Sequence, residues 1–212
     1  MKKFVKELIK RILPASLITL LRSIRATIVI YIWRRQSSPV PPPKYFKQQF
    51  ISKQQRITGY DILVETGTYL GEMIEAQRNF FSIIYSIELS DDLFLKASAK
   101  FKKYGHIKLI HGDSGKLMKE VIKQIERPSV FWLDGHYSAG ITALGETECP
   151  IYDELNSILI SPFPHLLLID DARCFNGTHD YPTITDLKKY FEHSGRKFSF
   201  SIVDDIIRVA LQ

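Results

Sequence analysis

Acidic side chains stand at the ends of five apolar runs in this sequence. These acids are Glu65, Glu88, Asp113, Asp134 and the pair Asp170-Asp171. One acid in such a place is an ordinary turn or helix cap, but acids after all five runs are harder to explain by capping alone. Carboxylates that lie close together repel one another unless they are protonated or bound to a cation, and they accept hydrogen bonds from hydroxyl groups. The pattern therefore predicts a site for a cationic or hydroxyl-rich ligand.

A glycine turn follows the first of these runs. Glu65, Gly67 and Gly71 have the spacing Glu-x-Gly-x-x-x-Gly, between an apolar run and a segment with helical character from Glu72. A strand, a glycine turn and a helix form the first half of a βαβ nucleotide site. The spacing departs from the dinucleotide fingerprint Gly-x-Gly-x-x-Gly, which argues against an NAD-linked oxidoreductase. An ordinary strand-to-helix turn would explain the same residues.

Apolar runs and amphipathic segments alternate through the rest of the chain. The expected strands are 62–64, 83–88, 107–111, 129–133, 166–169, 198–203 and 206–211. Helices are expected between them, because strands that alternate with helices form a parallel sheet covered on both faces. The predicted fold class is therefore α/β, with a Rossmann-like, seven-stranded, mostly parallel sheet and helices on both faces. The last two strands flank Asp204-Asp205 and predict a C-terminal antiparallel β-hairpin.

Positive charge is concentrated at the start of the 212-residue chain. Residues 1–56 hold 13 Lys/Arg and one acid, whereas residues 57–212 hold 16 Lys/Arg and 22 Asp/Glu. Because the later part is acidic, nucleic acid is not an expected partner. The two cysteines, Cys149 and Cys174, have neither a disulfide nor a metal-ligand pattern, which favours reduced thiols and a cytoplasmic location.

The charge distribution and a proline-rich stretch divide the sequence into a leader (1–36), a linker and lead-in (37–56) and a domain (57–212). The leader has two apolar stripes beside basic residues, namely Phe4, Val5, Leu8, Ile9, Ile12 and then Leu17, Leu20, Leu21, Ile24, Ile28, Tyr31, Ile32. Arg22 and Arg25 disfavour a spanning helix, since each costs about 2.5–3.5 kcal/mol at a bilayer centre. We expect a peripheral anchor on the anionic inner face of a membrane. Packing on the domain or a homodimer is the alternative.

Over residues 60–212, the order of these motifs resembles the class I S-adenosylmethionine (SAM)-dependent methyltransferases. The predicted cofactor-binding residues are Glu65, Thr66, Gly67, Thr68, Gly71, Glu88, Asp113, Ser114 and Asp134. The resemblance implies that the turn lies against the methionine and ribose parts, that Glu88 takes the ribose hydroxyls, and that Asp113 and Ser114 border the adenine. The physical chemistry agrees, because glycine lets backbone approach a ligand and a carboxylate can accept from two vicinal hydroxyls.

A narrower resemblance concerns a metal. Asp134 with Asp170-Asp171 is similar to the magnesium-dependent O-methyltransferases of the catechol and macrocin (sugar) types. It implies Mg²⁺ on Asp134, Asp170 and Asp171, since this hard cation prefers oxygen ligands. The alternative has Asp170 as a helix cap and Asp171 in solvent.

The catalytic base departs from the catechol pattern, because no lysine follows Asp134. His136 lies two residues further on, and its reference pKa near 6.5 suits proton transfer. We therefore predict His136 and Asp134 as catalytic residues, and His179 and Tyr181 as residues that shape the acceptor pocket.

The acceptor is predicted from the loop after Asp134. Residues 135–150 resemble small methyltransferases encoded among bacterial polysaccharide genes. With the basic leader, this favours O-methylation of a sugar hydroxyl on a glycan or glycolipid precursor. The alternatives are a methyltransferase that acts on a protein or small molecule, and an inactive SAM-binding or membrane-tethered scaffold.

Overall fold

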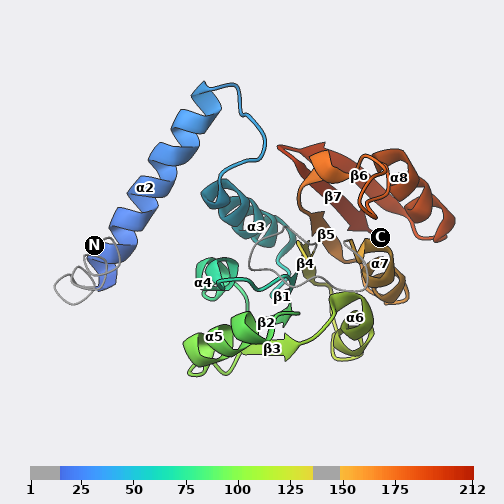
Figure 1. The fold of residues 1–212 in the computed structure, drawn as a ribbon, viewed down its shortest axis with the longest axis horizontal. Coiled ribbons are helices and arrows are strands. Elements are labelled where there is room, and N and C mark those ends of the chain that lie inside the picture. Colours follow the sequence, from blue (N-terminus) through green and yellow to red (C-terminus); the bar gives the residue numbers. More distant parts are fainter. Residues whose placement is uncertain (1–14, 136–148) are drawn as a thin grey trace. The chain divides into compact units, whose positions relative to one another are not determined.

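Seven strands form one sheet in the computed structural model of the chain, which describes residues 15–135 and 149–212. The strands are β1 (Ile62–Thr66), β2 (Ile83–Glu88), β3 (Ile107–His111), β4 (Val130–Leu133), β5 (Leu166–Ile169), β6 (Phe198–Val203) and β7 (Ile206–Leu211). Their order across the sheet is β3-β2-β1-β4-β5-β7-β6. Strands β1 to β5 pair in parallel, and β7 is antiparallel to both β5 and β6 (Figure 1). The predicted fold class, including the C-terminal hairpin, is confirmed.

The central strands are continuous apolar runs because both faces of the sheet are covered. Every residue of β1, β4 and β5 is buried. Strands that are buried on both sides need no alternation of polar and apolar residues. The hairpin turns at Asp204 and Asp205, whose φ angles of 49° and 70° are both positive. A two-residue turn that matches the twist of its strands requires this conformation.

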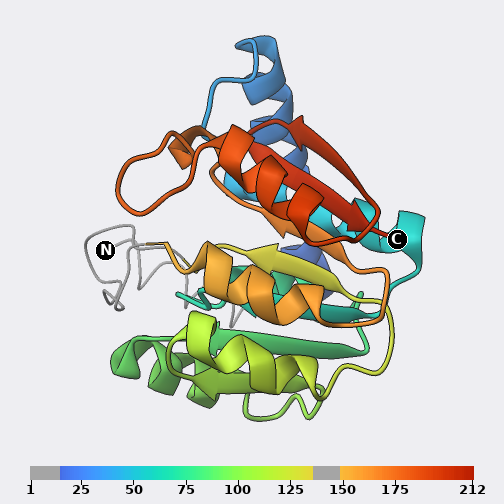
Figure 2. The ribbon, with the colours of Figure 1, turned by 90° about the vertical axis from the view of Figure 1, so that its right-hand side faces the viewer.

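Helices cover the two faces of the sheet in separate groups. They are α4 (Glu72–Gln77), α5 (Asp91–Phe101), α6 (Ser114–Ile122), α7 (Ile151–Leu159) and α8 (Ile184–His193). Helices α4 and α5 lie on one face, and α6, α7 and α8 lie on the other (Figures 1 and 2). Met118, Leu155 and Phe191, one from each helix of the second group, are buried in one core with Phe131 and Leu167 of the sheet.

The helix α3 (Lys44–Thr58) was not predicted from the sequence. It occupies much of the stretch assigned to the linker and lead-in, and its second half begins the compact unit of residues 50–212. Ile51 is fully buried, the Ser52 hydroxyl donates to the Gln77 side chain of α4 (2.9 Å), and Arg208 of β7 donates to Gln54 (3.2 Å). Phe50 is also buried on the face of Ile51 and Gln54, so a short apolar face and two side-chain hydrogen bonds fix this half of the helix.

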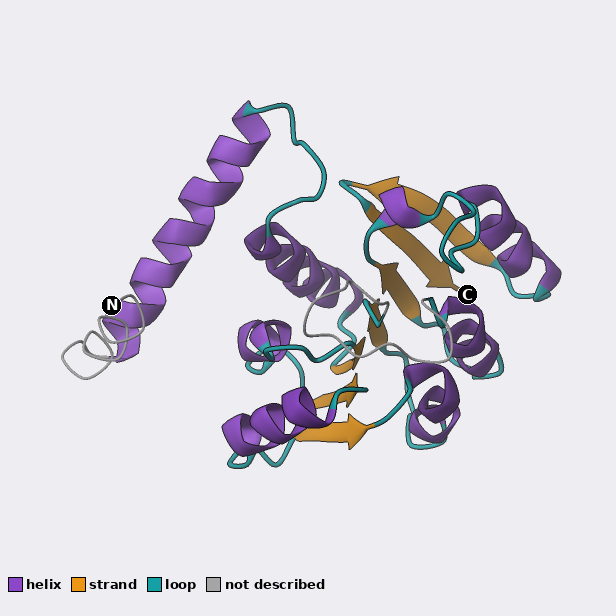
Figure 3. Ribbon diagram, viewed as in Figure 1, coloured by secondary structure: helices purple, strands orange, loops and turns teal. Residues whose placement is uncertain are grey.

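The other compact unit comprises residues 1–49, and its described part contains the helix α2 (Ala15–Arg35) and the start of α3. Figure 3 distinguishes these helices from the loop that joins them. Within residues 15–135 and 149–212, no helix combines the length and the hydropathy that crossing a membrane requires.

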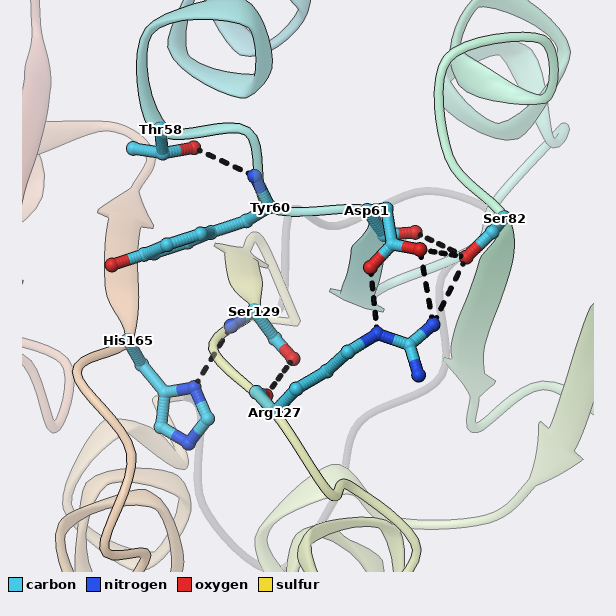
Figure 4. A network of polar contacts seen from close by, with 7 residues as sticks. All are labelled: Thr58, Tyr60, Asp61, Ser82, Arg127, Ser129 and His165. Carbon is cyan, nitrogen blue, oxygen red and sulfur yellow. Dashed lines mark hydrogen bonds and ion pairs between the residues drawn. The ribbon is translucent and has the colours of Figure 1, made fainter.

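A polar network ties together the amino ends of the strands, at the edge of the sheet away from the acids. The Arg127 guanidinium donates to both carboxylate oxygens of Asp61, at 2.7 and 3.0 Å, and to the Ser82 hydroxyl at 3.2 Å (Figure 4). Asp61 and Ser82 directly precede β1 and β2, and Arg127 lies three residues before β4. The paired geometry lowers the pKa of Asp61 and keeps it ionised, so the network fixes the starts of three strands.

A buried histidine completes this edge of the sheet. The Ser129 N–H donates to Nδ1 of His165 (3.1 Å), and Nε2 of the ring lies 2.7 Å from the Ser161 hydroxyl (Figure 4 shows the first bond). Since Nδ1 accepts, Nε2 carries the ring hydrogen. Burial lowers the pKa of His165 to about 4, so this histidine is neutral and structural at neutral pH.

Candidate functional site

The predicted acids converge because the register of the sheet puts their strand ends in one row. Ile87, Thr66, Leu133 and Ile169 are successive partners across β2, β1, β4 and β5. The residues that directly follow these four in the sequence are Glu88, Gly67, Asp134 and Asp170, respectively. All four strands run in the same direction, so these residues leave the sheet at one edge. The row spans the point between β1 and β4 where the strand order reverses, which is where open α/β sheets bind ligands.

The glycine turn packs directly against the end of β4. Gly67 has φ 81°, and its N–H donates to the Ile87 carbonyl at 3.0 Å. A Cβ atom at this position would lie 2.5 Å from the Asp134 carbonyl oxygen. Gly71, with φ 64°, precedes α4, and a Cβ there would lie 2.5 Å from the Phe101 ring. The turn therefore has room for neither side chain, and its backbone stays close to the rim.

Lys100 of α5 holds the same turn from its other side. Its ammonium donates to the carbonyls of Leu70 and Gly71, at 3.0 and 3.1 Å. Only the tertiary fold brings it to a turn about thirty residues earlier in the chain.

Glu88 is held in a fixed orientation at the end of β2. Its Oε2 accepts from the Tyr69 N–H (2.7 Å) and its Oε1 accepts from the Ser90 N–H (2.9 Å), and the residue is buried. Each carboxylate oxygen has a second lone pair, so the group can still accept from two hydroxyls on one ligand. This geometry suits the ribose role that the family resemblance implies for Glu88.

Glu65 lies beneath the turn and is fully buried. The Ser86 hydroxyl donates to Glu65 Oε2 at 2.6 Å, and the Thr68 hydroxyl lies 2.6 Å from Ser86. Burial raises the pKa of Glu65 to about 8, the Ser86 hydrogen bond opposes this rise, and the nearby charge of Glu88 adds to it. Glu65 is therefore protonated at neutral pH and connects β1, β2 and the turn.

The titration of Glu65 gives a test of this arrangement. The pKa of Glu65 is about 4.5 in the unfolded chain and about 8 in the folded protein. Between pH 4.5 and pH 8, the folded protein therefore carries one more proton than the unfolded chain. The free energy of unfolding therefore falls as the pH rises from 4.5 to 8, by up to about 1.4 kcal/mol per pH unit. We expect Glu65→Gln, which cannot ionise, to gain stability relative to the natural protein across this window. Urea unfolding at pH 5, 6.5 and 8 measures the difference, with the exposed Glu126→Gln as control. Parallel stability curves for Glu65→Gln and the natural protein would contradict the assignment.

Glu154 of α7 is a site residue that sequence reasoning missed. It is 2% exposed, accepts from the Ser114 hydroxyl at 2.5 Å, and is also bonded by the Thr66 hydroxyl. Burial raises its pKa to about 7, and the two hydroxyl bonds oppose the rise. Thr66 Oγ1 in turn accepts from the Asp134 N–H (3.1 Å). Glu154 therefore links the end of β1, the start of α6 and the end of β4.

A signal for Glu154 is present in the sequence. Ile151, Glu154, Leu155 and Ile158 have the spacing of one helix face, and all four are buried. A single acid on an otherwise apolar face indicates a buried carboxyl with a specific partner. Asp113 has the simpler role of capping α6, because its side chain accepts from the Gly115 N–H at 2.9 Å.

Asp134, Asp170 and Asp171 form one cluster. One carboxylate oxygen from each lies within 4.8 Å of the other two. Asp170 is fully buried, and its Oδ1 accepts from the Asp171 N–H at 2.8 Å. Asp171 has φ 57°, in the left-handed region. Arg173 donates to Asp171 at 2.8 Å and also to Asp205, so part of the negative charge is balanced within the chain.

The cluster fits a hard divalent cation. Oxygen ligands lie about 2.1 Å from Mg²⁺, so two of them on opposite sides of the ion are about 4.2 Å apart. Three ligands of one ion are at most this far apart, and small side-chain rotations would bring the three carboxylate oxygens, which lie within 4.8 Å of one another, inside that limit. An all-carboxylate set favours magnesium or manganese over softer metals. Asp134, Asp170 and Asp171 are therefore the residues that could hold the predicted metal.

Tyr181 lies near this cluster, in the segment between η1 (Ala172–Cys174) and α8. Its ring packs edge-on against Phe175, with 5.3 Å between the ring centroids. Burial raises the pKa of Tyr181, and negative charge at Asp171 and Asp134 adds to the rise. His179 of the same segment is exposed, and His136 lies outside the described residues.

Comparison with known proteins shows similarity in structure rather than in sequence. The sequence matches no protein-family model and no curated protein. The O-methyltransferase of Bacillus cereus, solved in complex with S-adenosylhomocysteine (SAH), superposes with a TM-score of 0.55 at 13% identity, covering 88% of this chain and 89% of that one. TomG of Streptomyces achromogenes, an O-methyltransferase of tomaymycin synthesis solved with SAM, gives 0.55 at 12% identity over 88% of each chain.

A fungal enzyme extends this comparison over nearly the whole chain. The SAH-bound methyltransferase PaMTH1 of Podospora anserina superposes with a TM-score of 0.54 at 16% identity, covering 95% of this chain and 98% of that one. At such identities the likeness establishes the fold and leaves the chemistry to the site itself. This chain has the Rossmann-like fold of the SAM-dependent O-methyltransferases.

Proposed function

We propose that this chain is a SAM-dependent O-methyltransferase. The observation that carries the proposal is the row of Gly67, Glu88, Asp134 and Asp170 at one edge of the sheet, across the point where the strand order reverses. The turn brings backbone close to the ligand, Glu88 offers paired acceptors for a ribose, and Asp113 lies at the start of α6, where an adenine would be bordered. The shared fold of methyltransferases solved with SAM or SAH supports the same function.

Methyl transfer from SAM needs little covalent chemistry from the protein itself. Bound SAM would supply a methyl group on a sulfonium sulfur. An acceptor oxygen would attack that carbon in line, with SAH as the leaving group. The chain must therefore hold the acceptor behind that carbon and keep it oriented, which can lower the barrier by several kcal/mol, on the order of a well-aligned intramolecular reaction. Tyr181 stays a predicted residue of the acceptor pocket.

We further propose a divalent metal on Asp134, Asp170 and Asp171. A bound metal would lower the pKa of an acceptor hydroxyl. The three carboxylates would fix the position of that hydroxyl relative to the turn, and Arg173 would limit how far Asp171 moves. His136, two residues after Asp134 in the sequence, stays the predicted proton acceptor.

For the acceptor we propose a sugar hydroxyl on a glycan or glycolipid precursor. The support is the likeness of the acidic motifs to the macrocin (sugar) type and the basic leader, which suits a membrane-linked substrate. A protein or small-molecule acceptor is the competing substrate class. An inactive scaffold is disfavoured, because three clustered carboxylates repel one another in the folded state even with Arg173 beside Asp171.

A thermal-shift panel followed by a transfer assay tests the proposed function. SAM and SAH are expected to raise the melting temperature, and NAD is not, because only a ligand that binds the folded state stabilises it. Transfer of a labelled methyl group from SAM is then measured with lipid-linked sugars, free sugars, catechols and peptides. Stabilisation by NAD alone would reject the methyltransferase assignment, and transfer only to catechols or peptides would reject the sugar acceptor.

A further inference from the structure

Helix α2 presents a continuous apolar face to solvent. The residues of this face are Leu17, Leu20, Leu21, Ile24, Ile28, Tyr31 and Ile32, and their exposed fractions run from 39% to 63%. With 3.6 residues per turn they fall within an arc of about 120° on one side of the helix. Single exposed apolar residues are normal on a protein surface, but a contiguous stripe of seven marks an interaction surface.

The opposite side of α2 is already occupied within its own unit. Trp33 is buried, its ring lies 4.8 Å from the Phe46 ring, and its indole N–H donates to the Pro39 carbonyl at 2.7 Å. The Arg34 guanidinium lies 4.5 Å from the centre of the Trp33 ring. Ala26, on the same side as Trp33, is also buried. These contacts fix the end of the helix so that the apolar face points away from its own unit.

Charge identifies the kind of surface that would cover this face. Arg25 and Arg35 are exposed on α2, and residues 1–56 carry 13 basic residues against one acid. A second copy would bring two such basic segments together, and like charges at an interface cost free energy. An anionic lipid surface offers acyl chains to the apolar residues and phosphates to the arginines. Arg22 and Arg25 within α2 disfavour insertion across the bilayer, so the helix would lie along the surface.

We propose that α2 docks lengthwise on an anionic lipid bilayer, with its seven-residue apolar face at the acyl boundary and its arginines at the phosphates. The proposal is independent of the methyltransferase assignment. It also places the chain at the surface where lipid-linked acceptors occur.

Vesicle flotation of the full-length protein tests the proposal. We expect the protein to float with vesicles made of equal parts phosphatidylglycerol and phosphatidylcholine, and to float far less with phosphatidylcholine alone. The double variant Ile24→Glu/Ile28→Glu should lower binding by about tenfold or more, because it puts two charges on the apolar face. Ile160→Glu, directly after α7, is the matched control, since Ile160 is 69% exposed and lies outside this face. The control should float like the natural protein.

A second variant separates the charge contribution from any effect on folding. Arg25→Glu/Arg35→Glu leaves the apolar face intact and is expected to reduce flotation, and high salt should do the same to the natural protein. Equal flotation of the Ile24→Glu/Ile28→Glu variant and the control would overturn the proposal. A dimer in solution that the same variant converts to a monomer, with flotation unchanged, would assign the face to a second copy instead.

Discussion

Replacing Gly67 with alanine is expected to lower the affinity for SAH about 100-fold and to reduce methyl transfer. The new Cβ would lie 2.5 Å from the Asp134 carbonyl oxygen, and the residue would be held at φ 81°. A positive φ costs about 1–3 kcal/mol for most residues, and the overlap must be relieved by moving the turn or the end of β4. If moving the turn or the end of β4 costs about 3 kcal/mol of binding free energy, the affinity for SAH falls roughly 100-fold. Calorimetric titration with SAH measures the change.

Gly59→Ala is the matched control for this prediction. Gly59 also has a positive φ, 72°, but a Cβ there meets nothing within 4 Å. The control therefore adds comparable backbone strain without a clash and away from the rim. We expect it to lose some stability and to keep full SAH affinity. If Gly67→Ala bound SAH as tightly as Gly59→Ala, the close approach of the turn to β4 would have no part in the site.

Replacing Asp170 with asparagine is expected to lower turnover by about two to three orders of magnitude while SAH affinity stays within a few-fold. Asp170 is the fully buried member of the acidic cluster, so its charge is the least screened by solvent. Asparagine keeps an oxygen that can accept from the Asp171 N–H but removes the charge that a divalent cation needs. The melting temperature is expected to hold or rise, because repulsion within the cluster is reduced.

Steady-state kinetics across a magnesium titration check this prediction. The variant should need more Mg²⁺ for half-maximal activity, and a chelator should inactivate the natural protein. Asp186→Asn, in the first turn of α8 and outside the cluster, is the control and should leave turnover unchanged. The natural protein could keep full activity in the presence of a chelator, or Asp170→Asn could keep it without one. Either result would show that catalysis does not depend on a metal at this cluster.

The sequence predicted the strands closely because parallel strands buried on both faces are short apolar runs with polar ends. Val130–Leu133 and Leu166–Ile169 are such runs, and the acid after each one is at the edge of the sheet because the strands are parallel. The common row of Gly67, Glu88 and Asp134 depends on strand register, which the sequence does not show.

The features that sequence reasoning missed depend on tertiary contacts. Helix α3 is polar along most of its length, so only its packing against the domain shows that it is part of the fold. Glu154 was not predicted as a site residue, although its place on the same helix face as Ile151 and Ile158 indicates burial. The contact of Lys100 with the glycine turn joins segments that no local pattern connects.

The central claim is that the rim formed by the ends of β1, β2, β4 and β5 binds SAM. Calorimetric titration of SAH into the full chain and into two variants on opposite edges of the sheet tests it most directly. Glu88→Ala removes the paired acceptors at the rim, whereas Arg127→Ala breaks the network at the amino ends of the strands. The account predicts one SAH per chain, lost in Glu88→Ala and retained in Arg127→Ala. No binding to the natural protein, or equal binding by Glu88→Ala, would contradict it.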